Sequence, residues 1–253
     1  MVYIVVLMGS LIGLSALLAM RIAMRYRAVR KFVRSIRERS GKVKGETACH
    51  TVPDTPLERP RKNARTMHMV QEVRALERQA EKATAHGKYD EAEKLYIRAL
   101  TVDPRAHDTQ TALAKLYLTT DRDAKAEALY KEILMKIEDA ACYANLGLVL
   151  YKQGKYAEAC AAYERALEKD PSHAQRTFAL GRCYMATGQY DMAAPLLERA
   201  SIRLSRDTVL LRLLAECYMH IKDIDSAEAT YRRINKLEPY DEEIKAKLVA
   251  LAA

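Results

Sequence analysis

The chain has 253 residues and a formal net charge of +9 at pH 7, with five cysteines and no tryptophan. Residues 1–66 hold 14 Lys and Arg against 4 Asp and Glu, whereas the remainder holds 28 against 29, so the basic character belongs to the N-terminal part. A nearly neutral C-terminal part argues against a general nucleic-acid binder. The cysteines form no C-x-x-C pair and their number is odd, which argues against a disulfide framework and favours free, buried thiols in a reducing compartment.

Residues 1–20 form an apolar segment that contains no charged side chain. A helix of that length spans about 30 Å, which matches the hydrocarbon core of a bilayer. No basic residue precedes the segment and it runs directly into Arg21, which favours a retained transmembrane helix over a cleaved signal peptide. By the positive-inside rule, the cations that follow predict a single-pass membrane protein with the N-terminus outside and the C-terminal domain in the cytoplasm.

Residues 21–39 are predicted to form a basic juxtamembrane amphipathic helix. Its apolar side chains are spaced four and three residues apart, from Ile22 to Ile36, and make a narrow seam. One interpretation is that the helix lies against anionic lipid or acts as a topology signal. The other is a short coiled-coil seam that would make a homo-oligomer. In the first interpretation the membrane-surface residues are Arg21, Arg25, Arg27, Arg30, Lys31, Arg34 and Arg37.

Residues 40–62 are predicted to be a flexible linker, because glycines and prolines interrupt any helical pattern there. Cys49 and His50 lie in this segment, but residue 46 is Glu, so the haem-attachment spacing is not met. The pair is interpreted as part of a solvated loop. A helix is expected to resume at Asn63, with Asn63 as its N-cap, and to run into the first repeat, which makes it longer than the helices that follow.

The clearest pattern lies at residues 140–173. It predicts two helices, Ala140–Gln153 and Tyr156–Glu168, separated at Gly154, where glycine accepts a left-handed conformation at little steric cost. Gly147 lets the two helices approach closely, and Tyr163 fills the space beside it. Neither helix could bury its apolar face alone, so the unit needs neighbours of its own kind.

This segment resembles a tetratricopeptide repeat (TPR). The residues that carry the resemblance are Tyr143, Leu146, Gly147, Leu150, Ala159, Tyr163, Ala166 and Pro171. The pattern recurs in register, which gives repeats at 73–106, 107–139, 140–173, 174–207 and 208–241, a capping helix at 240–253, and a TPR domain over 63–253. The resemblance implies an all-α fold after the transmembrane helix: a superhelical solenoid of about five helix-turn-helix repeats and a cap. It also implies that the first helices line a concave groove.

The sequence contains no signature of an enzyme or of a cofactor site. It has no glycine-rich phosphate loop, no metal-spaced His/Cys cluster and no G-x-S-x-G motif. Carboxylates on the predicted helices, including Glu91, Glu93, Glu158, Glu164 and Glu168, are interpreted as solvated faces with i,i+4 ion pairs. We therefore expect no catalytic residue, no metal and no cofactor.

The groove is the remaining candidate site. By resemblance to the TPR family, its partner-binding residues are Lys115, Leu148, Tyr151, Lys152, Phe178, Arg182, Met185, Arg212 and Met219. An apolar centre surrounded by cations suits an extended or helical peptide that carries apolar anchors and acidic residues. An alternative is that Leu148, Phe178 and Met185 only pack between helices, since apolar helical stripes usually belong to a core.

The expected function is a membrane-anchored adaptor or scaffold that binds protein partners through the groove at the cytoplasmic membrane face. Alternatives are a self-assembling structural platform and a regulator of a membrane or envelope assembly or enzyme. The expected partners are proteins or peptides and, through the N-terminal segments, the membrane, with no nucleic acid.

Overall fold

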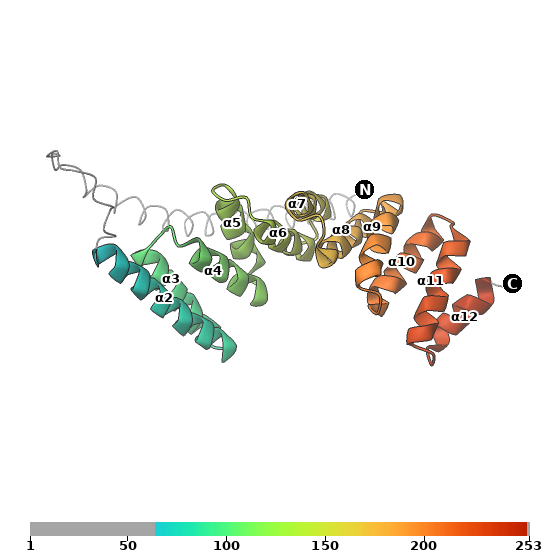
Figure 1. Ribbon diagram of the computed structural model, residues 1–253, viewed down its shortest axis with the longest axis horizontal. Helices are drawn as coiled ribbons and strands as arrows, with labels where there is room; N and C mark the ends of the chain where they lie inside the picture. Colours follow the sequence, from blue (N-terminus) through green and yellow to red (C-terminus); the bar gives the residue numbers. More distant parts are fainter. Residues whose placement is uncertain (1–63, 252–253) are drawn as a thin grey trace, which may run out of the picture. The chain divides into compact units, whose positions relative to one another are not determined.

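The computed structural model describes residues 64–251 (Figure 1). Eleven helices and no strands occur within this range. The helices are α2 (Ala64–Ala85), α3 (Tyr89–Val102), α4 (His107–Thr119), α5 (Asp123–Leu134), α6 (Ala140–Lys152), α7 (Tyr156–Lys169), α8 (Ala174–Ala186), α9 (Tyr190–Arg203), α10 (Thr208–His220), α11 (Ile224–Leu237) and α12 (Glu242–Leu251). The expected all-α fold is therefore confirmed for this part of the chain.

The predicted transmembrane helix (1–20), basic helix (21–39) and linker (40–62) lie outside the described residues. Among residues 64–251, every helix is too short or too polar to be a candidate for crossing a bilayer.

The helix boundaries follow the repeat pattern closely. Helices α4, α6, α8 and α10 each begin at the first residue of a predicted repeat. The two helices predicted at 140–173 are confirmed as α6 and α7, and the expected longer first helix is α2, with 22 residues. The predicted cap corresponds to α12. Aspartates fix several helix starts, because the side chains of Asp139 and Asp207 accept hydrogen bonds from the backbone N–H groups of Cys142 and Leu210.

The described residues fall into two compact units, one ending at Leu129 and the other beginning at Tyr130, so the division lies within α5. In the first unit, α2 packs along α3, and α3 also contacts α4. In the second unit, α6 with α7, α8 with α9, and α10 with α11 form three hairpins in chain order, and α12 packs on α11 (Figure 1).

Within the second unit, the first helices of the hairpins also contact one another, α6 with α8 and α8 with α10. In the described part of the unit, the second helices α7 and α9, and likewise α9 and α11, contact each other less than the first helices do. The first helices therefore lie closer together than the second helices do. We call the surface of α6, α8 and α10 that faces away from the second helices the inner face.

Glycine allows the close helix contact that the sequence predicts. A Cβ atom added to Gly147 on α6 would lie 2.9 Å from ring carbons of Tyr163 on α7. One repeat later, a Cβ on Gly181 would lie 2.7 Å from a methyl carbon of Leu197. Both distances are shorter than carbon atoms tolerate, so these hairpins need glycine at this position.

The turns inside the hairpins share one backbone conformation although their residues differ. Gly87, Gly154 and Gly188 have φ values of 73°, 75° and 74°. In the other two repeats Asp121 (φ 54°) and Lys222 (φ 63°) occupy the same left-handed region. The turn geometry is therefore retained where the sequence lacks the glycine, at a steric cost for a side chain such as that of lysine.

The interpretation of the helix carboxylates as solvated faces with i,i+4 pairs is wrong for Glu93, whose side chain is only 15% exposed. Glu93 accepts a hydrogen bond from Tyr117 Oη at 2.8 Å, binds Lys125 Nζ at 3.0 Å and forms an ion pair with Arg122. Burial raises the pKa of the Glu93 carboxyl, but these donors outweigh it and hold the pKa below its usual value. Glu93 therefore joins successive helices instead of facing solvent.

Glu158 and Glu164 also depart from the i,i+4 interpretation. Glu158 pairs across helices with Lys131, at 3.7 Å, and Glu164 accepts a hydrogen bond from the hydroxyl of Tyr184 on α8. Such contacts between helices are invisible to a pattern that considers one helix at a time.

Candidate functional site

Three of the predicted groove residues form an aromatic and arginine cluster on the inner face. The guanidinium carbon of Arg182 on α8 lies 5.0 Å from the ring centre of Tyr151 on α6 and 5.8 Å from that of Phe178. At the edge of this face, Tyr151 also meets Tyr156, the first residue of α7, with ring centres 5.2 Å apart in an edge-to-face arrangement. These distances fit cation–π and aromatic contacts. We call Tyr151, Tyr156, Phe178 and Arg182 the aromatic cluster.

Arg182 is exposed, and among the described residues it forms no ion pair with a carboxylate. A guanidinium that rests on ring faces keeps its edge N–H groups available for an acceptor such as a carboxylate. Leu148, which lies one turn before Tyr151 on α6, is 40% exposed and provides apolar surface on the same helix. The aromatic cluster can therefore bind an acidic group beside an apolar one.

Phe178 and Met185 are half-buried and pack against the core cluster formed by α9 to α12. The alternative that these residues pack between helices is therefore correct in part, since both side chains contribute to packing as well as to the surface. Lys152 is exposed at the end of α6. Lys115 is exposed on α4 and belongs to the first unit. The basic residues between Arg21 and Arg37 lie outside the described residues.

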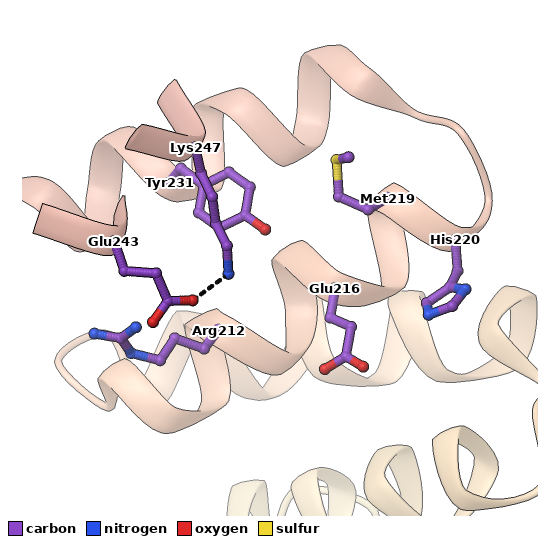
Figure 2. Close-up of a pocket in the computed structure, with 7 residues that line it drawn as sticks. All are labelled: Arg212, Glu216, Met219, His220, Tyr231, Glu243 and Lys247. Atoms are coloured by element: carbon purple, nitrogen blue, oxygen red, sulfur yellow. Dashed lines mark hydrogen bonds and ion pairs between the residues drawn. The ribbon is translucent and has the colours of Figure 1, made fainter. Parts of the chain in front are cut away.

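A pocket of about 430 Å³ lies at the C-terminal end of the inner face (Figure 2). Its lining residues are Arg212, Glu216, Met219 and His220 of α10, Tyr231 of α11, and Glu243 and Lys247 of α12. Figure 2 shows Arg212 and Glu243 at one end of the pocket and Met219 and His220 at the other. Met219 is 39% exposed. Two residues of the sequence-predicted site, Arg212 and Met219, therefore come together here.

The pocket differs from the aromatic cluster because its cations are already neutralised. Arg212 forms ion pairs with Glu238, at 2.7 Å, and with Asp241. Hydrogen bonds to Asp241 and Glu238 raise the pKa of Arg212, and the pKa values of both carboxyls are lowered by the same contacts. Lys247 binds Glu243 at 2.6 Å. Of these two arginines, Arg182 rather than Arg212 thus remains without a carboxylate partner among the described residues.

Three pocket residues, Tyr231, Glu243 and Lys247, were not among those predicted from the sequence. Glu243 and Lys247 belong to the predicted cap at 240–253, which was not included in the groove. Continuing the repeat register past residue 241 would have placed Glu243 near the start of a sixth first helix, and first helices are the ones expected to line the groove. No signal in the sequence distinguishes Tyr231, which also belongs to the core.

The described cysteines, Cys142, Cys160, Cys183 and Cys217, are free and buried, as expected. Burial raises the pKa of Cys183 to about 12 and that of Cys217 to about 12, so both thiols are protonated at neutral pH. Within residues 64–251, no group of His, Cys, Asp and Glu side chains is placed to hold a metal ion.

Comparison with known proteins agrees with the helical hairpins. One family model described as tetratricopeptide repeat matches residues 83–146 and 188–251, and a second model with the same description matches residues 144–208. Such repeats generally mediate protein–protein interactions and typically form non-enzymatic scaffolds.

Two curated human proteins are similar over the repeats. Protein O-mannosyl-transferase TMTC1 is 27% identical over 145 residues, which cover 56% of this chain and 16% of that protein. Tetratricopeptide repeat protein 21B is 25% identical over 173 residues, which cover 68% of this chain and 13% of that protein. The chain thus spans a small part of the length of both relatives.

The crystal structure of YrrB shares the fold, with a TM-score of 0.61 and 17% identity over 72% of this chain and 95% of that one. The repeated sequence pattern, the stacked hairpins and these matches lead to one conclusion: the chain belongs to the tetratricopeptide repeat family.

Proposed function

We propose that this chain is a membrane-anchored adaptor whose inner face binds a protein partner through an extended, acidic segment. The observation that carries the proposal is the exposed Arg182 guanidinium, which is oriented by Tyr151 and Phe178 and lacks a carboxylate partner among the described residues. An arginine held in this way loses little conformational freedom when it binds an acceptor, which favours recognition of a carboxylate.

The partner segment is expected to combine an acidic side chain with a neighbouring apolar one. The acidic group would bind Arg182, and the apolar group would contact Leu148 and the Tyr156 ring, which are 40% and 37% exposed. YrrB, which shares the fold, is described as a TPR protein with an unusual peptide-binding site, and this supports a peptide as the ligand class.

The proposed location of the repeats at a membrane is supported by the sequence alone. The uncharged segment 1–20 and the eight cations between Arg21 and Arg39 support an anchor that keeps the repeats on the cytoplasmic side. An anchor of this kind would raise the effective concentration of the inner face near partners at the same membrane.

Peptide selection by the full-length chain in detergent or nanodiscs tests the proposal. A random peptide library should yield sequences that pair an acidic residue with an aliphatic or aromatic one, and Arg182→Glu should abolish their enrichment. Arg165→Glu is the matched control, because Arg165 is also an exposed arginine of the second unit but lies on α7, where it pairs with Glu168. Enrichment of the same peptides by the Arg182→Glu chain would refute the proposal.

A further inference from the structure

A second surface, away from the inner face, combines exposed cations with exposed apolar side chains. On α9, Ile202 and Arg203 follow Arg199 by three and four residues and therefore lie on its side of the helix. Arg206 follows in the next loop. On α11, one repeat later, the same positions hold Arg233, Lys236 and Leu237, followed by Tyr240. We call these eight residues the basic strip.

The cations of the basic strip are not neutralised within the described part of the chain. Arg203 donates to the backbone oxygen of Ser172 at 3.1 Å, and Arg199 and Arg233 reach only hydroxyl oxygens, of Thr177 and Ser201, both at 3.5 Å. Arg206 and Lys236 form no ion pair with any described residue. The contact of Arg233 with Ser201 also shows that the α9 and α11 parts of the strip adjoin each other.

The carboxylates nearest to the basic strip in the sequence are occupied by other groups. Asp207 caps α10 by accepting from the N–H of Leu210. Glu238 and Asp241 bind Arg212. Glu228 pairs with Arg232. Burial raises the pKa of Tyr218, and the neighbouring Glu198 carboxylate raises it further. The positive charge of the strip is therefore left for an external anion.

On the equivalent surface of α7, one repeat before α9, the cations are paired with carboxylates. There Arg165 pairs with Glu168 at 2.9 Å, and Lys169 pairs with Glu138. The last equivalent position is Ser172, in place of Arg206 and Tyr240. The basic, apolar character is therefore a property of α9 and α11 and not of every repeat.

Helix C-termini attract cations, which explains a basic residue at each helix end but not the apolar side chains between them. Tyr240 is 90% exposed and Ile202 is 76% exposed. Aromatic and aliphatic tips surrounded by Arg and Lys are typical of surfaces that settle into the interfacial region of an anionic bilayer. Nucleic acid and acidic proteins would also complement the positive charge. They offer less apolar environment for the exposed Tyr240 and Ile202 side chains than a bilayer does.

We infer that the basic strip of α9 and α11 docks on an anionic lipid surface. This orients the second unit on the membrane by a contact separate from the predicted N-terminal segments and from the inner face. The sequence prediction that residues 1–20 anchor the chain supplies the reason for a bilayer to be close to this surface.

The absence of tryptophan from the chain allows a direct test. The full-length Tyr240→Trp variant carries one tryptophan, at the tip of the strip. It is placed with vesicles of phosphatidylcholine alone or of phosphatidylcholine with phosphatidylglycerol, each with or without spin-labelled lipid. We expect blue-shifted emission and quenching by the spin label only with phosphatidylglycerol, and a loss of both when the salt concentration is raised. The basic residues between 21 and 39, which are also predicted to bind anionic lipid, are present in every variant. The charge-neutralising variants therefore separate their contribution from that of the basic strip.

Charge-neutralising variants in the Tyr240→Trp background identify the surface. Arg199→Gln with Arg203→Gln should lower the docking equilibrium constant about thirtyfold, since each cation near an anionic surface contributes roughly fivefold. The matched control is Arg165→Gln with Lys169→Gln, which removes the same charge from the equivalent positions of α7 and should leave docking unchanged. Circular dichroism melting of each variant verifies folding.

Equal emission and quenching with both lipid compositions would overturn the inference, as would equal losses in the two double variants. Binding of a DNA duplex or polyglutamate through Arg199 and Arg203, without a response to anionic vesicles, would overturn the assignment of the partner as lipid.

Discussion

Arg182 on α8 and Tyr151 on α6 are joined by a cation–π contact of 5.0 Å that connects two successive hairpins of the second unit. The contact holds the one inner-face arginine of this unit that makes no ion pair with described residues. Tyr151→Leu keeps apolar surface at this position but removes the ring. We expect this variant to bind an acidic peptide about two- to fivefold more weakly, which corresponds to an exposed cation–π contact. Isothermal titration calorimetry measures the change, and unchanged affinity would mean that the ring does not orient Arg182.

The close contact between Gly147 and Tyr163 predicts that a larger side chain at position 147 destabilises the second unit. Gly147→Ala would place a methyl group 2.9 Å from the Tyr163 ring and force α6 away from α7. We expect a cost of about 1–3 kcal/mol, as for overpacking of a core. Urea denaturation measures it, and Ala141→Ser, at an exposed position of the same helix, is the control. A stability equal to that of the unaltered chain would show that the hairpin can open at no cost.

The left-handed turns predict effects of opposite sign at two positions. Gly154→Ala adds a side chain at φ 75° and should destabilise the second unit by about 1 kcal/mol. Lys222→Gly removes a side chain at φ 63° and should stabilise it by a few tenths to about 1 kcal/mol, because glycine avoids the steric cost but loses more entropy on folding. Thermal and urea melts test both. Shifts of the same sign would contradict the account of the turns.

The Glu93 network predicts a pH dependence in the first unit. Burial alone would raise the pKa of Glu93, but its contacts with Tyr117, Lys125 and Arg122 lower it below the ordinary value of 4.5. Since the pKa is lower in the folded state, the ionised carboxylate stabilises the fold above pH 4.5, and this contribution is lost as the pH falls through the lowered value.

Glu93→Gln should therefore melt at a lower temperature than the unaltered chain at neutral pH, and the difference should shrink as the solution is acidified below pH 4.5. Glu91→Gln, two residues away on the same helix with its side chain 58% exposed, should melt like the unaltered chain throughout. A Glu93→Gln difference that stays constant with pH would show that ionisation of Glu93 does not contribute.

The sequence predicted those parts of the fold that depend on one hairpin at a time. Gly147, Tyr163 and Gly154 were placed correctly because helix spacing and glycine conformation are local properties. The left-handed Lys222 could not be predicted, since the turn is imposed by the packing of α10 on α11 and not by its own residue. Glu93 was misinterpreted because its partners lie beyond its own helix.

The candidate site was predicted in part for the same reason. Family positions placed Tyr151, Phe178 and Arg182 on one face, but only the structure shows that the arginine rests on both rings. Arg212 was expected to be a cation of the groove, whereas the loop after α11 brings Glu238 and Asp241 onto it. The basic strip could not be predicted from the sequence. Exposed cations occur on many helices, and only the structure shows which of them are paired with carboxylates of neighbouring repeats.

Photo-crosslinking from the inner face tests the central claim most directly. The full-length chain, expressed in its native host, carries a photoreactive amino acid in place of Leu148 on the inner face or of the exposed Ala161 on α7. The account predicts a protein partner that crosslinks from position 148 and not from position 161, through a segment with an acidic residue, and that is lost with Arg182→Glu. Identical crosslinks from both positions, or crosslinks at position 148 that persist with Arg182→Glu, would contradict it.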